Sequence, residues 1–213
     1  MEAHFNIEQG SYEWHEIRHG KIGGTSSKGL FVKSDTLLFD LLAEKTESFI
    51  EEESYISDDM LRGMQLEPEA REWANKNFKC EFIECGWMQS DIELLGISPD
   101  GITADFTQAI EIKCPQAKRH IQTVIENEIP LDNLHQCLHY FTVNDRLQQL
   151  HFISYRPESI KPVFVKTLRR MSEINLGTKA KPDFRVIKEW VEVAKNHATE
   201  LQNKINQTLS TLW

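Results

Sequence analysis

The stretch that most constrains this chain spans residues 98–115 and reads Ser-Pro-Asp-Gly, a short spacer, then Glu-Ile-Lys-Cys-Pro. A proline and a glycine flank Asp100, and both favour turns, so Asp100 is expected at a bend. Residues 109–113 alternate between apolar and polar side chains, as in a half-buried strand. Because strand side chains repeat every second residue, Glu111 and Lys113 share one face. Two carboxylates and one ammonium are therefore expected to converge.

Such a cluster predicts phosphodiester hydrolysis. Carboxylate oxygens suit Mg²⁺ or Mn²⁺, and a site with one or two acids leaves room for water and a substrate phosphate. We expect one or two ions beside Asp100 and Glu111. The Lys113 ammonium can orient water or steady charge on the phosphate. The alternative is an exposed hairpin with one surface ion pair at Glu111.

The full sequence pattern of this stretch resembles that of the Asp…Glu-x-Lys nuclease superfamily. Within this superfamily it is similar to the phage lambda exonuclease branch, which comprises the alkaline exonucleases of phage recombination systems. A bare Asp…Glu-x-Lys pattern is common by chance, whereas the longer pattern of Ser-Pro-Asp-Gly followed by Glu-Ile-Lys-Cys-Pro is much more specific. The resemblance covers most of the chain from Trp14 to about Tyr155. It implies an α/β, restriction-endonuclease-like fold with a central mixed sheet flanked by helices.

A second family pattern, Gly-x-x-x-Glu-x-x-Ala-Arg, matches residues 63–71. The resemblance places Glu67 close to the metal, bound directly or through water. Glu69 is the rival acid on sequence alone. The implied metal ligands are thus Asp100, Glu111, the Ile112 carbonyl and Glu67. The implied catalytic residues are Asp100, Glu111, Lys113 and Glu67.

A third pattern concerns substrate binding. Trp14 and Arg18 are four residues apart, hence on one helical face, and Gly-Gly-Thr-Ser follows at residues 23–26. Main-chain amides and hydroxyls of such a turn can bind an anion. The resemblance implies a pocket for the 5′-terminal phosphate, with Arg18 and Thr25 as candidate ligands. It also implies a Gln-x-x-x-Tyr helix, matched by Gln136 and Tyr140, in which Gln136 reaches toward the phosphate at the site, and Ser98 is a further expected substrate ligand. The alternatives are an arginine stacked on a tryptophan beside a flexible loop, and an exposed polar Gln136.

Length and charge limit the organisation of the chain. Its 213 residues suffice for one sizeable core, so we expect a single nuclease domain over residues 1–213. The net charge of −9 argues against nonspecific coating of nucleic acid. Residues 1–113 carry a net charge of −13, and residues 114–213 carry a net charge of +4. This difference suits DNA held along a local surface, and a random distribution of surface charge explains it equally well.

The expected location rests on the lack of a targeting or membrane-spanning pattern, and the expected partners rest on the resemblance. The chain starts without a signal-peptide pattern and has no apolar run of membrane-spanning length. We expect an intracellular protein, in the cytoplasm of a bacterial host, with no membrane partner. The resemblance further implies a phage or prophage origin, a homotrimer, double-stranded DNA with a free end, and a single-strand annealing protein as partner.

The function implied is a metal-dependent 5′-to-3′ double-strand DNA exonuclease that releases 5′-mononucleotides and leaves 3′ single strands for phage-type homologous recombination. One alternative is an endonuclease of the same superfamily, acting in restriction or repair. Another is a DNA- or protein-interaction module that retains the fold without catalysis. The intact Asp100, Glu111 and Lys113 disfavour the latter.

Periodicity predicts the remaining elements. Helices are expected at residues 35–47, 58–77, 131–144 and 183–212, and strands at 80–88, 94–98, 150–155 and 163–168. Pro68 should kink or restart its helix. The strands at 80–88 and 94–98 should form an antiparallel meander with residues 110–112. His120 is expected at the surface or behind the ligands, with direct approach to the metal as the alternative.

Overall fold

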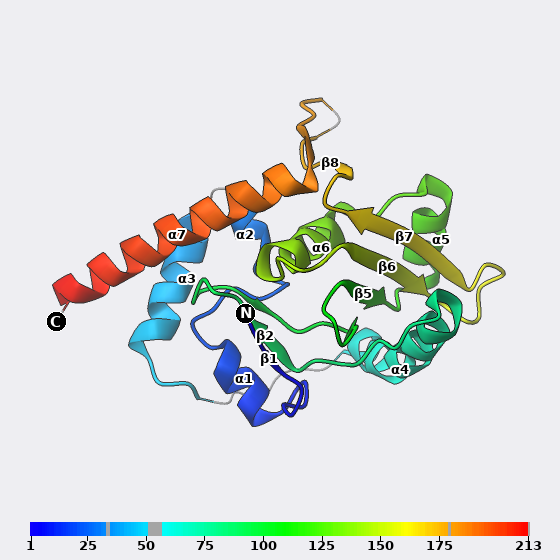
Figure 1. The fold of residues 1–213 in the computed structure, drawn as a ribbon, viewed down its shortest axis with the longest axis horizontal. Helices are drawn as coiled ribbons and strands as arrows, with labels where there is room; N and C mark the ends of the chain where they lie inside the picture. Colours follow the sequence, from blue (N-terminus) through cyan, green and yellow to red (C-terminus); the bar gives the residue numbers. More distant parts are fainter. Residues whose placement is uncertain (33–34, 51–56, 179, 213) are drawn as a thin grey trace.

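The computed structural model describes residues 1–32, 35–50, 57–178 and 180–212 (Figure 1). The elements in order are β1 (Glu2–His4), α1 (Tyr12–Arg18), α2 (Lys28–Phe31), α3 (Asp35–Thr46), α4 (Asp58–Phe78), β2 (Trp87–Gln89), β3 (Gly96–Ile97), β4 (Gly101–Ile102), β5 (Gln108–Lys113), α5 (Ala117–Glu126), α6 (Leu131–Val143), β6 (Gln149–Tyr155), β7 (Val163–Arg169), β8 (Glu173–Asn175), β9 (Phe184–Val186) and α7 (Ile187–Leu212).

The central sheet is mixed, as predicted. Its strand order is β4-β5-β6-β7, and only the β5–β6 pair within it is parallel. A parallel pair needs a long crossover, which α5 and α6 supply between Lys113 and Gln149. The crossover carries the chain away from the end of β5, so Lys113 lies where the helices and the sheet meet.

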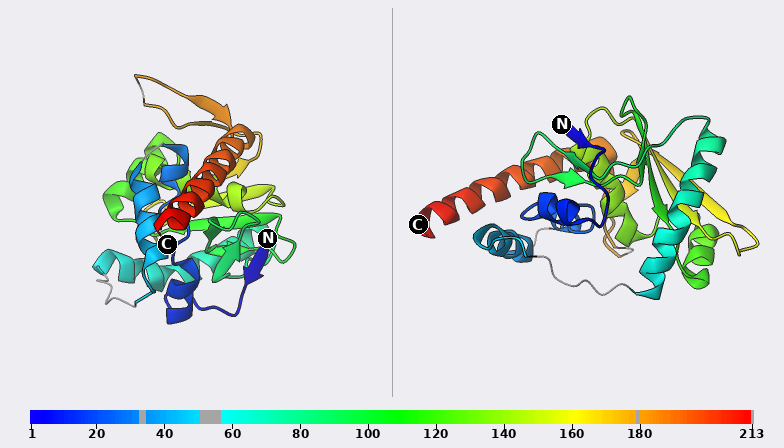
Figure 2. Two further views of the ribbon diagram at one scale, coloured as in Figure 1. Left: turned by 90° about the vertical axis from the view of Figure 1, so that its left-hand side faces the viewer. Right: turned by 90° about the horizontal axis from the view of Figure 1, so that it is seen from below.

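Both faces of this sheet are covered by helices. On one face, Ala70 and Ala74 of α4 pack in a cluster with Ile110 and Ile112 of β5. On the other, α6 and α7 contribute to the larger cluster that contains Ala109 and Phe152. β5 is therefore buried on both faces, and the polar residue between its two isoleucines is enclosed. The C-terminal part of α7 extends beyond this body (Figures 1 and 2).

The predicted meander is wrong. β2 and β3 do pair, but in a separate antiparallel sheet of order β1-β2-β3. Pro99 lacks the amide that would extend β3, so the chain turns there and β4 starts afresh against β5. Residues 80–86 are irregular apart from one bridge between Ile83 and Ile102. At Gly86 a Cβ atom would lie 2.0 Å from the carbonyl oxygen of Ile7, because two main chains meet there.

Two further expectations for long helices are corrected in part. α4 is continuous through Pro68, so the helix does not restart there, and its apolar side packs on the sheet beyond that point. The final helix begins at Ile187, because residues 184–186 form β9 and pair with β8. The Asn175 side chain accepts from the amides of Gly177 and Asp183 and so joins the two strands. In the described part of the chain, no helix combines the length and apolarity needed to cross a membrane.

Candidate active site

Asp100 lies in the bend between β3 and β4, and it is held from three sides. Its Oδ2 atom accepts from the Ile112 amide at 2.6 Å, and its carbonyl oxygen accepts from Arg71 Nε at 2.6 Å. Its own amide faces the Tyr140 hydroxyl at 3.4 Å, and that hydroxyl donates to the Ile110 carbonyl at 3.2 Å. The carboxylate thus has a fixed position beside β5.

Glu111 is enclosed between the sheet and α6, with 0% of its surface exposed. Its Oε1 atom forms an ion pair with the Lys113 ammonium. Among the described residues, its Oε2 atom has no hydrogen-bond partner. The exposed-hairpin alternative for this stretch is therefore wrong. A buried carboxylate oxygen without a partner is costly, and a bound cation would relieve that cost.

The charges of the site shift one another. Burial raises the pKa of Asp100 well above its ordinary value, and the nearby charge of Glu111 raises it further. Burial alone would lower the pKa of Lys113, but the charges of Glu111 and Asp100 outweigh this, so its pKa is raised. Lys113 therefore stays an ammonium at neutral pH. It can donate hydrogen bonds and offset negative charge, but it cannot take up a proton.

The two rival acids of α4 point to different places. Glu67 accepts from Arg71 Nη2 at 2.8 Å and lines the same groove as Lys113. Burial raises the pKa of Glu67, and the charge of Arg71 opposes this. Glu69 instead accepts from the Tyr155 hydroxyl at 2.6 Å, which ties α4 to β6. Glu67 is thus the acid of this pair that lies at the site.

These acids do not make a complete metal centre by themselves. Within residues 1–32, 35–50, 57–178 and 180–212, no three histidine, cysteine, aspartate or glutamate side chains are gathered closely enough to hold an ion. A cation would rest on Asp100 and Glu111, with main-chain carbonyl and water oxygens completing its shell. Mg²⁺ commonly binds in this way, through one or two carboxylates and several waters.

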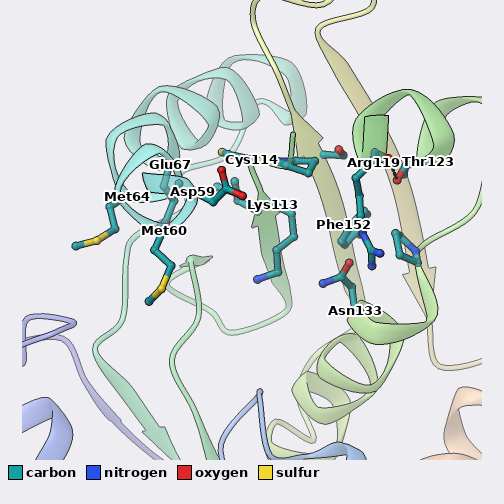
Figure 3. Close-up of a pocket in the computed structure, with 15 residues that line it drawn as sticks. Asp59, Met60, Met64, Glu67, Lys113, Cys114, Arg119, Thr123, Asn133 and Phe152 are labelled. Atoms are coloured by element: carbon teal, nitrogen blue, oxygen red, sulfur yellow. Dashed lines mark hydrogen bonds between the residues drawn. The ribbon is translucent and has the colours of Figure 1, made fainter. Parts of the chain in front are cut away.

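A groove with a volume of about 470 Å³ opens on one side of Lys113. Figure 3 shows Lys113 reaching into the space between α4 and the α5–α6 side, with Asn133 opposite. We call it the Lys113 groove. Its α4 wall includes Met60, Met64 and Glu67, and its opposite wall includes Arg119, Thr123 and Asn133.

A smaller cavity, of about 130 Å³, lies on the Asp100 side. We call it the Arg18 pocket. It brings together all four predicted substrate ligands and Asp100, although they come from four separate parts of the chain. The lining residues are Gln9, Trp14, Arg18, Gly24, Thr25, Trp87, Ile97, Ser98, Asp100 and Gln136.

Contacts within the Arg18 pocket fix its polar groups. The Arg18 guanidinium carbon lies 3.7 Å from the centroid of the Trp14 ring, so the stacking named in the alternative interpretation is present, and it occurs in a residue that also lines the pocket. Trp14 Nε1 donates to Ser98 Oγ at 2.8 Å, which leaves the Ser98 hydroxyl hydrogen free for another acceptor. A Cβ atom at Gly24 would lie 3.0 Å from the Gln136 side chain. The glycine turn therefore packs closely against half-buried Gln136.

His120, which the sequence leaves as a possible metal ligand, has a structural role instead. His120 is fully buried, and its two ring nitrogens bond to Ser154 Oγ at 2.8 Å and to the Lys161 carbonyl at 2.7 Å. It has no ring nitrogen left for a metal. Sequence reasoning missed the parts that Arg71 and Tyr140 play in holding Asp100. Arg71 ends the pattern that matches residues 63–71, and Tyr140 ends a Gln-x-x-x-Tyr pattern that begins at Gln136, but a pattern does not say which carbonyl or amide a side chain will reach.

Comparison with known proteins gives a family match and a shared fold. Residues 13–146 match the family model described as the YqaJ-like viral recombinase domain. No curated protein sequence matches the chain. Among solved structures, the alkaline exonuclease LHK-Exo from Laribacter hongkongensis is 23% identical with a TM-score of 0.72, over 95% of this chain and 98% of that one.

Two further structures are similar. LHK-Exo in complex with dAMP is 23% identical with a TM-score of 0.71, over 95% of this chain and 100% of that one. A phage-related exonuclease from Haemophilus somnus 129PT is 12% identical with a TM-score of 0.53, over 100% and 97%. At these identities the likeness establishes a shared fold. The predicted fold class, a mixed α/β nuclease fold, is confirmed.

Proposed function

Because this chain belongs to the YqaJ-like viral recombinase domain family, we propose that it is a metal-dependent deoxyribonuclease that degrades double-stranded DNA from its ends. The observation that carries the proposal is the position of Asp100. Its carboxylate neighbours Glu111, and the same residue lines the Arg18 pocket. An anion held by Arg18 would lie beside the carboxylates that bind the metal.

The size of the Arg18 pocket favours a phosphate group as its occupant. About 130 Å³ is well below the roughly 300–1,000 Å³ typical of pockets for drug-sized ligands. One guanidinium, the hydroxyls of Thr25 and Ser98 and the Gln136 amide are groups that bind phosphate oxygens. The pocket therefore suits the terminal 5′-phosphate of a DNA strand better than it suits a whole nucleotide.

The residues of the site fit a divalent cation. Asp100, Glu111 and the Ile112 carbonyl would hold one or two Mg²⁺ ions, or Mn²⁺, and Glu67 would take part through water. In an extended strand the amide and carbonyl of one residue face the same edge, and the Ile112 amide already faces Asp100. The metal would lower the pKa of a bound water and offset charge on the scissile phosphate.

The protein's own residues would do the rest. Lys113, held as an ammonium by Glu111, would orient a water or stabilise charge on the phosphate from the groove side. Arg18, held over the Trp14 ring, would fix the strand end so that the scissile bond faces the carboxylates. The Lys113 groove would take the strand beyond that bond.

We extend the proposal to polarity, product and partners. The LHK-Exo structure with dAMP supports release of 5′-mononucleotides by a related fold. A pocket for a 5′-phosphate supports degradation in the 5′-to-3′ direction, leaving 3′ single strands for phage-type recombination. A single nuclease domain over residues 1–213, a homotrimer, a single-strand annealing protein as partner and a bacterial cytoplasm complete the proposal.

The test uses linear duplex labelled at either end and closed circular duplex, each incubated with Mg²⁺, with E111Q as the variant that lacks the site. We expect wild type to release mononucleotides from linear DNA and to leave the circle intact. We expect E111Q to cleave neither substrate. Cleavage of the circle would support the endonuclease alternative. Binding of DNA without cleavage by wild type would support the interaction module.

A further inference from the structure

Arg71 contacts three separate parts of the chain at once. Its Nε atom donates to the Asp100 carbonyl at 2.6 Å, and its Nη2 atom lies 2.8 Å from Glu67 Oε1 and 2.9 Å from Glu84 Oε2. The side chain is 16% exposed. One planar guanidinium thus joins the acid of α4, the main chain of the Asp100 bend and the segment before β2.

Several contacts other than those of Arg71 also attach α4 to the sheet and its neighbouring segments. Tyr155 donates to Glu69, Arg62 Nη1 donates to the Cys114 carbonyl at 3.0 Å, and the Phe82 amide donates to Asn75. Ala70 and Ala74 also pack in the apolar cluster beneath the helix. The contacts of Arg71 are instead directed at two candidate site residues and at Glu84.

We propose that Arg71 is a positioning residue that fixes Glu67 relative to Asp100, so that Glu67 can bind a water of the cation that Asp100 and Glu111 would hold. This inference rests on the proposed function, because it assigns Arg71 a part in that same site. It goes beyond that function by naming a residue that would touch neither the metal nor the DNA.

The shared Nη2 atom explains why Glu67 can serve a cation and still be held. A carboxylate that turned toward a metal-bound water would weaken its bond to Arg71. Glu84 would keep the guanidinium paired in that arrangement, and the Asp100 carbonyl would keep it oriented. Lysine cannot substitute, because a single ammonium lacks the rigid fork that reaches a carbonyl and a carboxylate together.

The test compares R71K with R62K. Arg62 is a matched control, because it lies on the same helix and also joins a main-chain carbonyl to a carboxylate, those of Cys114 and Glu158. Mg²⁺ and Mn²⁺ binding to the DNA-free protein is measured by calorimetry. The Mg²⁺ concentration for half-maximal cleavage and the melting temperature are measured on the same samples.

We expect R71K to weaken metal binding about 10- to 100-fold, to need correspondingly more Mg²⁺, and to regain turnover at saturating Mg²⁺. R62K should bind metal like wild type. In an E67Q background the effect of R71K should shrink, because the two residues act together.

Equal metal affinity in R71K and R62K would overturn the inference, as would loss of the folded state in R71K, since the proposal requires α4 to stay docked. If wild type itself neither binds metal nor cleaves DNA, the proposed function fails instead.

Discussion

The Arg18 guanidinium lies against the Trp14 indole, 3.7 Å from its centroid, while the indole nitrogen donates to Ser98. One side chain therefore orients two groups of the Arg18 pocket by different physical means. The ring face holds the cation, and the ring edge sets the direction of the Ser98 hydroxyl. These two effects can be separated by substitution.

Trp14→Phe keeps a ring face for Arg18 but removes the donor to Ser98. We expect the preference for a 5′-phosphate over a 5′-hydroxyl end to fall roughly 2- to 12-fold, the equivalent of one neutral hydrogen bond of about 0.5–1.5 kcal/mol. The measurement is the ratio of initial rates on the two ends. Trp73→Phe, on α4, is the control and should leave the ratio unchanged; an equal fall in both variants would contradict the assignment.

Asp100→Asn should separate folding from metal binding. The raised pKa of Asp100 means that its ionised form is unfavourable in the metal-free fold, whereas an amide oxygen can still accept from the Ile112 amide. Without metal, we expect the variant to melt at the wild-type temperature or above it. Mg²⁺ should stabilise wild type and not the variant. A melting temperature that Mg²⁺ raises equally in both proteins would rule out Asp100 as a ligand.

The sequence predicted which candidate residues lie together better than it predicted the pairing of the strands around them. Asp100, Glu111 and Lys113 lie within 14 residues, so turn chemistry and strand alternation suffice to bring them together. The Arg18 pocket needed the family resemblance, because Ser98 and Gln136 are far in sequence from Arg18 and Thr25. Strand pairing depends on which strand edges remain available in the folded chain, and local sequence does not show this. The predicted meander was therefore wrong, although the predicted mixed sheet was right.

The burial of Glu111 was not predictable from alternation. A polar residue between two isoleucines predicts an exposed face, yet α6 covers that face here. Arg71 likewise appears in the sequence as the end of a helical pattern. Its bond to the Asp100 carbonyl depends on the tertiary approach of α4 to the bend. Such contacts follow from packing and leave no local signal.

Lys113→Met tests the buried ion pair. It removes the ammonium that neutralises fully buried Glu111. Loss of one partner of a buried pair costs about 3–5 kcal/mol, and because the Lys113 side chain is 34% exposed we expect roughly 2–3 kcal/mol of lost stability without metal. Urea unfolding measures it. The K113M/E111Q double variant should regain most of the loss; unchanged stability in K113M would show that the pair matters little to the fold.

Two buried histidines, His139 and His151, should make the free energy of unfolding depend on pH. Burial lowers the pKa of both His139 and His151 to about 4, below the ordinary 6.5. The unfolded chain therefore binds protons that the folded one does not. Their contribution is complete above pH 6.5 and is lost as pH falls toward 4, by up to roughly 3 kcal/mol for fully buried His139. NMR titration of the ring signals, with urea unfolding of metal-free D100N at pH 7 and 5, checks this. Ring signals that titrate near pH 6.5 would contradict it.

The most direct test of the account asks whether the Arg18 pocket and the two carboxylates act as one site. Linear duplexes that differ solely in a 5′-phosphate or a 5′-hydroxyl are digested with Mg²⁺ by wild type, Arg18→Ala and Arg146→Ala. The last is a matched control, because Arg146 also lies over an aromatic ring, that of Phe106, away from the pocket.

A charge-assisted contact of roughly 1.5–3 kcal/mol corresponds to a rate preference of roughly 10- to 150-fold for the phosphorylated end. We predict that preference for wild type and Arg146→Ala, and its loss in Arg18→Ala with slow residual cutting. Equal initial rates of wild type on the two duplexes would contradict the account.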